Sequence, residues 1–140
     1  MDAPYHLQRF VDAQQDSYQR ACAELRVGEK RSHWMWYIFP QIAGLGTSEM
    51  AQRYAIASLT EARAYLQHPL LGLRLRECSR LVAAVRDRTI HDIFGYPDDM
   101  KFHSCMTLFA QAAPHDDLFR ACLEKYFGGR LDAATLARLA

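Results

Sequence analysis

The sequence predicts a mainly α-helical fold of about six to eight short helices with little or no sheet. Apolar residues recur every three or four positions over most of the chain, and capping residues, prolines and glycines mark where these segments begin and end. Half of the 140 residues are apolar and 24% are charged, which is typical of a folded chain and excludes intrinsic disorder of the whole. No linker or internal repeat interrupts the pattern, so we expect one domain over residues 1–140.

The first periodic segment covers about residues 6–25, as one bent helix or two short ones, and Gly28 ends it. The next segment, residues 33–39, is the densest apolar stretch and contains both tryptophans. It is too short for periodicity to separate a strand from a buried helix, and Pro40 stops it in either case. The sequence therefore leaves its secondary structure open.

Two helix starts are predicted in the middle of the chain. After a glycine-containing loop, Thr47 or Ser48 caps a helix that runs to about Ala57. Ser58 and Glu61 then have the spacing of a capping box, which opens a further helix. A His-Pro pair ends this helix and starts the next one.

The second half of the chain predicts four more segments. Residues 69–86 have the clearest helical periodicity and should form the central packing element. Residues 89–94 form a short turn or helix, and Pro97 begins a helix with acidic residues in its first turn. Residues 118–127 form another helix, and residues 132–139 complete the chain as a short helical tail.

Charge and motifs disfavour several classes of function. The formal net charge is +1, so no global field attracts nucleic acid or an anionic membrane, and no apolar run approaches the ~20 residues that span a bilayer. The chain begins with no targeting signal, so we expect a cytoplasmic protein. The histidines lack metal-ligand spacing, and the cysteines lack a Cys-x-x-Cys pair, so we expect no metal and no cofactor. The cysteines fit reduced thiols in a core: Cys22, Cys78, Cys105 and Cys122.

A glycine-containing turn is the first candidate site. Gly44 and Gly46 would let backbone amides approach a ligand, and Ser48 would stand at a helix N-terminus that can hold phosphate or carboxylate. The turn has too few glycines for a dinucleotide fingerprint and lacks the Gly-Lys-Ser ending of a P-loop. A plain loop with an N-cap explains the same residues.

The helix that Pro97 begins is the second candidate. Asp98, Lys101 and Ser104 are three residues apart, so an acid, an amine and a hydroxyl share one helix face. At this spacing an Asp–Lys pair is usually a weak surface ion pair. Burial of the face would favour a functional role, because uncompensated polar groups are costly in a dry cleft.

The tryptophan-rich segment is the third candidate. Flat rings together with the amide of Gln41 can hold a base or a sugar by stacking and hydrogen bonding. The same rings are typical of a core, and this interpretation fits Trp36 and Phe39 better. Trp34, which has polar neighbours, leaves both interpretations open.

Six motifs over nearly the whole chain point to a known family. They are residues 33–41, 44–46, 54–56, 61–66, 68–72 and 98–109. Together they resemble the bacterial family catalogued as domain of unknown function 1810. The resemblance implies a small, mainly helical single-domain fold and no established activity. Members are sometimes labelled calpastatin, but that inhibitor is a disordered chain and this composition is typical of a folded one.

One position departs from the family pattern. The last motif often has two serines, and this chain has Ser104 followed by Cys105, so chemistry that needed the second hydroxyl is in doubt. A looser similarity is to N-glycosidases that remove ADP-ribose-type adducts. No motif matches them position by position, so no catalytic residue is carried over.

The leading hypothesis is a pocket for a small anionic compound of nucleotide or ribosyl type, with N-glycosidic hydrolysis as its reaction. In this hypothesis Trp34 and Trp36 form a wall of the pocket, and Gln41 orients the ligand. The other ligand-binding residues are Gly44, Gly46, Ser48, Lys101 and Ser104. The candidate catalytic residues are Asp98, Lys101 and Glu61. The alternative is a non-catalytic helical module that binds another protein, whose identity the sequence does not indicate. The pocket hypothesis requires Trp34, Gln41, Ser48 and Lys101 to line one cleft.

Overall fold

Ten helices make up the computed structural model, which describes residues 5–140, so the mainly helical fold class is confirmed. The helices are α1 (Gln8–Gln14), α2 (Tyr18–Val27), α3 (Met35–Ile38), α4 (Glu49–Arg53), α5 (Leu59–Gln67), α6 (Leu71–Ala84), α7 (Ile90–Phe94), α8 (Asp98–Ala112), α9 (Asp117–Phe127) and α10 (Ala133–Leu139). They exceed the predicted six to eight because the first segment divides into two helices and α3, α4 and α7 are each four or five residues long.

Local signals explain most of the boundaries. Gly28 ends α2 in the left-handed conformation (φ 75°), where a residue without Cβ is least strained. Ser48 and Ser58 cap α4 and α5 as predicted, each accepting a bond from a backbone N–H in the first turn. The carboxylate of Glu61 accepts from the N–H of Ala57 at 2.9 Å, so the second bond of the capping box forms one residue earlier than usual.

The structure settles the secondary structure of one segment that the sequence left open and shortens one predicted helix. Residues 33–39 contain the single-turn helix α3 rather than a strand. The helix predicted to run to Ala57 ends at Arg53, because Ile56 instead pairs with Ile42 in an isolated parallel bridge. This bridge ties the loop after α3 to the chain after α4.

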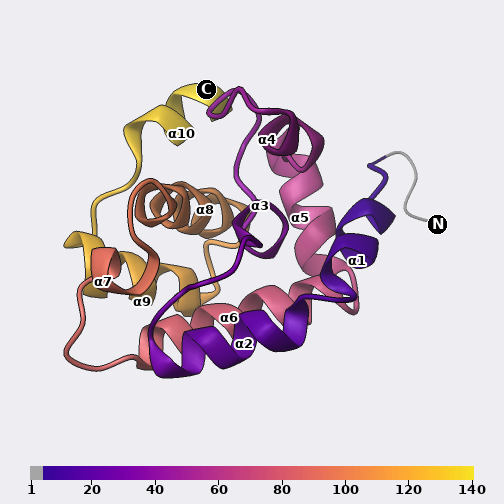
Figure 1. The fold of residues 1–140 in the computed structure, drawn as a ribbon. Helices are drawn as coiled ribbons and strands as arrows, with labels where there is room; N and C mark the ends of the chain where they lie inside the picture. Colours follow the sequence, from indigo (N-terminus) through magenta and orange to yellow (C-terminus); the bar gives the residue numbers. More distant parts are fainter. Residues whose placement is uncertain (1–4) are drawn as a thin grey trace.

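The central packing element is α8, not the earlier helix over residues 69–86. Figure 1 shows α8 end-on in the middle of the molecule, with α9, α5, α7 and α10 packed around it. Residues 104–110 are all buried, since small or apolar side chains surround this stretch of the helix on every side. In contrast, α6 carries arginines on one side and packs against α2, α5 and α9 with the other.

The four cysteines are free thiols in the core, as the sequence predicted. Burial raises the pKa of Cys122 to about 12. Over residues 5–140 no helix has the length and apolarity that crossing a membrane requires.

Candidate functional site

Two amines share one carboxylate at the start of α8. Asp98 Oδ2 lies 2.8 Å from Lys30 Nζ, and Asp98 Oδ1 lies 3.9 Å from Lys101 Nζ. Lys30 is 8% exposed and its amine also lies 5.0 Å from the centroid of the Trp34 ring, so Lys30 is the closer and more enclosed partner. Two amines therefore share one carboxylate, and Lys101 has the more distant contact of the two.

The amine of Lys101 lies over the second tryptophan. Its Nζ is 5.3 Å from the centroid of the Trp36 ring, which is within the range of a cation–π contact. Both side chains line an inner cavity of about 10 Å³, roughly the size of one water molecule, together with Gln41. Within residues 5–140 the side-chain amide of Gln41 makes no hydrogen bond, so its donors and acceptor are available to a ligand.

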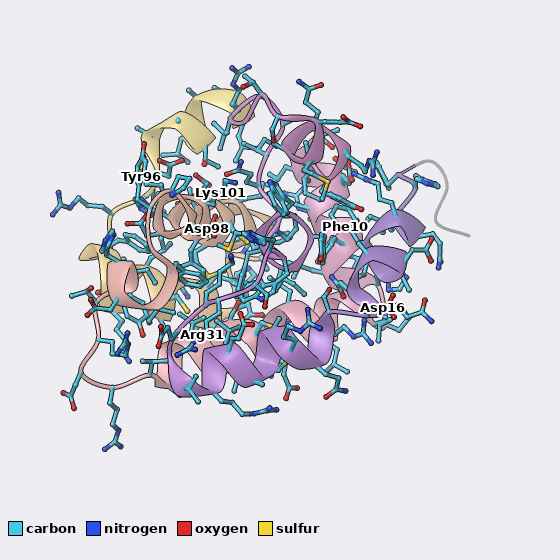
Figure 2. The ribbon with its side chains drawn as sticks, viewed as in Figure 1. Phe10, Asp16, Arg31, Tyr96, Asp98 and Lys101 are labelled. Carbon is cyan, nitrogen blue, oxygen red and sulfur yellow. The ribbon has the colours of Figure 1, made fainter. Side chains whose placement is uncertain are left out.

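Gln41 and Lys101 also line a larger outer cleft of about 290 Å³. Its walls come from the loop between α3 and α4, the start of α8 and the start of α10. Figure 2 shows Tyr96, Asp98 and Lys101 together around the beginning of α8. Tyr96 and Met100 are 74% and 58% exposed, so they form an apolar rim above polar groups.

Ser104, His103 and Asp132 also line the outer cleft. Asp132 Oδ2 accepts hydrogen bonds from the Ser104 hydroxyl at 2.9 Å and from both the hydroxyl and the N–H of Thr135, at 2.6 and 3.1 Å. The other oxygen, Oδ1, accepts none within the described chain. His103 Nε2 donates to the carbonyl of Arg130 at 2.8 Å, which leaves Nδ1 as an acceptor when the ring is neutral.

The structure thus brings together about half of the residues that the sequence singled out. Trp36, Gln41 and Lys101 line the inner cavity, and Gly46 and Ser104 line the outer cleft with Gln41 and Lys101. Asp98 lines neither cavity but forms an ion pair with Lys101. The shared helix face of Asp98, Lys101 and Ser104 is partly buried, with side-chain exposures of 19% for Asp98 and 24% for Lys101.

Trp34 is not a wall of the site, which corrects the ligand hypothesis. Its side chain is 0% exposed, and its indole N–H donates to Glu24 Oε1 at 3.0 Å. A buried indole needs such a partner, and Glu24 supplies it from α2. The core role expected of Trp36 is also wrong in part, since Trp36 is the tryptophan that reaches a cavity.

Gly44 and Ser48 do not line the cleft either, so only Gln41 and Lys101 of the four residues that the pocket hypothesis required line it together. The Gly44 carbonyl accepts from the Arg138 guanidinium at 3.1 Å, and a Cβ at Gly44 would lie 2.6 Å from Arg138 Cζ. Gly44 (φ 96°) therefore serves contact with α10 instead of a ligand. Ser48 is exposed and its hydroxyl caps α4, which agrees with the alternative interpretation of this turn as a loop with an N-cap.

Glu61 lies in neither cavity. It is 4% exposed at its side chain and pairs with Arg9 at 3.2 Å, while its other oxygen accepts the bond from Ala57. A carboxylate held on both oxygens by structural partners is not available as an acid or base. Its burial therefore reflects packing of α1 against α5.

Three residues at or beside the cleft are absent from the candidate residues of the sequence. His103 and Asp132 line the cleft, and Lys30 binds Asp98 next to it. Tyr96 precedes Pro97 directly and lies five residues before Lys101. An aromatic residue at this position could have been predicted to lie near Lys101. In the described residues 5–140, no three His, Cys, Asp or Glu side chains gather where they could hold a metal ion.

Comparison with known proteins agrees with the motifs. The family described as "Protein of unknown function (DUF1810)" matches residues 4–139. The chain is similar to the crystal structure of the conserved hypothetical protein Rv1873 from Mycobacterium tuberculosis, with 55% identity, 97% of each chain covered and a TM-score of 0.96. None of the curated proteins matches. The chain therefore belongs to the DUF1810 family, as its motifs indicated.

Proposed function

We propose that the outer cleft binds a small anionic compound of nucleotide or ribosyl type. The observation that carries the proposal is that Lys101 lines the cleft while its neighbour Asp98 is bound more closely by Lys30. A positive charge that its own carboxylate does not neutralise attracts an anion. The free amide of Gln41 beside it adds donors for the same anionic group.

The remaining shape of the cleft fits an organic ligand better than a bare ion. Tyr96 presents an exposed ring at the rim, and Pro97, Met100 and Leu45 add apolar surface around it. A flat base can stack on such a ring while the charged end of the ligand reaches Lys101. A cleft of about 290 Å³ lies near the lower end of the range of small-molecule sites.

The binding test is calorimetry and thermal shift with adenosine 5′-monophosphate and ADP-ribose. We expect both compounds to raise the melting temperature, because a ligand that binds the native state stabilises it by mass action. Lys101→Met should weaken binding about tenfold or more through loss of a charge-assisted contact. Arg63→Met is the matched control, since Arg63 is an exposed cation on α5 outside the cleft.

Two results would overturn the proposal: neither compound binds, or Lys101→Met binds as tightly as the unchanged protein. The first result would favour the alternative, a non-catalytic module that binds another protein. Chromatography of the same mixtures tests N-glycosidic hydrolysis, in which water adds at the anomeric carbon and the base leaves with a proton. Asp132 replaces Asp98 and Glu61 as the carboxylate for that reaction, because it lines the cleft.

A further inference from the structure

Both donors and acceptors of hydrogen bonds line the outer cleft. Lys101 offers an ammonium group, and Gln41 offers an unpaired amide. Asp132 offers a carboxylate oxygen, and His103 offers a ring nitrogen that is an acceptor when the ring is neutral. A ligand that satisfies both kinds of group carries acceptors as well as hydroxyl or amino donors.

The hydrogen bonds around Asp132 fix which oxygen is offered. Three donors from Ser104 and Thr135 converge on Oδ2, and they hold the carboxylate in one orientation. The backbone N–H of Asp132 donates to the hydroxyl of Thr107, a fully buried side chain of α8, at 2.9 Å. The unpaired Oδ1 is thus positioned by its surroundings before any ligand arrives.

We infer that Asp132 Oδ1 receives the hydroxyl groups of a sugar whose phosphate lies at Lys101, so that the cleft selects a ribosyl phosphate over an equally charged compound without sugar hydroxyls. This inference rests on the proposed function and gives the ligand an orientation. A carboxylate oxygen accepts from a hydroxyl in a charge-assisted bond, and two neighbouring ribose hydroxyls match an oxygen with two lone pairs. An anion placed at Asp132 would meet a negative charge, which excludes the reverse orientation.

Calorimetry with a series of matched ligands tests the inference. Adenosine 5′-monophosphate and its 2′,3′-dideoxy analogue have the same base and the same phosphate and differ only in the two hydroxyls. We expect the analogue to bind the unchanged protein about tenfold more weakly or worse. Asp132→Ser removes the unpaired oxygen but keeps a residue that caps α10 well, so this variant should lose the discrimination and retain its fold.

The outcomes separate the two proposals. If adenosine 5′-monophosphate does not bind at all, the proposed function fails. If it binds in a Lys101-dependent way but the dideoxy analogue binds equally well, the proposed function stands and the role of Asp132 is wrong. If Asp132→Ser fails to fold, the ligand series on the unchanged protein still decides, because it requires no substitution.

Discussion

Replacing Glu24 with glutamine tests what holds the segment from Arg31 to Trp34 against α2. Glu24 Oε1 accepts from the Arg31 N–H at 2.8 Å and from the Trp34 indole at 3.0 Å, and Oε2 accepts from the Ser32 hydroxyl at 2.6 Å. Burial by itself raises the pKa of Glu24, but the hydrogen bonds from Ser32, Arg31 and Trp34 outweigh it and lower the pKa from 4.5 to about 2. One pKa unit corresponds to about 1.4 kcal/mol, so the carboxylate contributes about 2–3 kcal/mol, the lower figure allowing for its contact with water.

The sign of the pH dependence follows from the lowered pKa. The stabilisation is fully present above pH 4.5, where the unfolded chain is also ionised, and it is lost as the pH falls towards 2. We therefore expect Glu24→Gln to reduce the free energy of unfolding by about 2–3 kcal/mol at pH 7 and by roughly half of that or less at pH 3. Urea unfolding followed by tryptophan fluorescence measures both values.

Glu77→Gln is the control for this experiment, because Glu77 is exposed on α6 and makes no hydrogen bond or ion pair within residues 5–140. Its effect should stay within about 0.5 kcal/mol. A Glu24→Gln variant as stable as the unchanged protein at pH 7 would refute the reasoning. So would a loss of stability that is equal at the two pH values.

Two further predictions concern the packing around α5. In Gly72→Ala the new Cβ would lie 2.0 Å from the Leu66 carbonyl oxygen. We therefore expect urea unfolding to show a free energy of unfolding that is lower by at least about 2 kcal/mol. Leu73→Ala is the control, because Leu73 is exposed and its replacement should change this free energy little. A normal stability of Gly72→Ala would show that α5 and α6 separate easily. Arg9→Met leaves the buried Glu61 carboxylate without its cation and should cost about 3–5 kcal/mol, part of which Arg9→Met with Glu61→Gln should restore. No restoration in the double variant would mean that Arg9 acts only through its bonds to backbone carbonyls.

Local rules predicted much of the fold. Serine caps, a left-handed glycine and apolar periodicity depend on residues close together in the chain, which is why the starts of α4 and α5 and the end of α2 were found. The central position of α8 was missed for a different reason. Which helix lies in the middle depends on what packs around it, and helical periodicity in one segment does not report on the others.

In the candidate site, too, the sequence predicts what depends on residues close together in the chain and misses what depends on distant ones. Lys101 and Ser104 were found because helical spacing places them on one face. The sequence left the role of Trp34 open and favoured the core for Trp36, whereas the structure buries Trp34 and places Trp36 at a cavity. The partner of the buried Trp34 indole is Glu24, ten residues earlier and on another helix, which periodicity does not report. The contact of Ser104 with Asp132 spans 28 residues, and only the folding of α10 onto α8 brings the two together.

A crystal structure of the protein with adenosine 5′-monophosphate is the most direct test of the proposed binding mode. The predicted result is one ligand in the outer cleft, with a phosphate oxygen within about 3 Å of Lys101 Nζ and a ribose hydroxyl equally close to Asp132 Oδ1. A ligand bound elsewhere, or one whose phosphate lies beside Asp132, would contradict it.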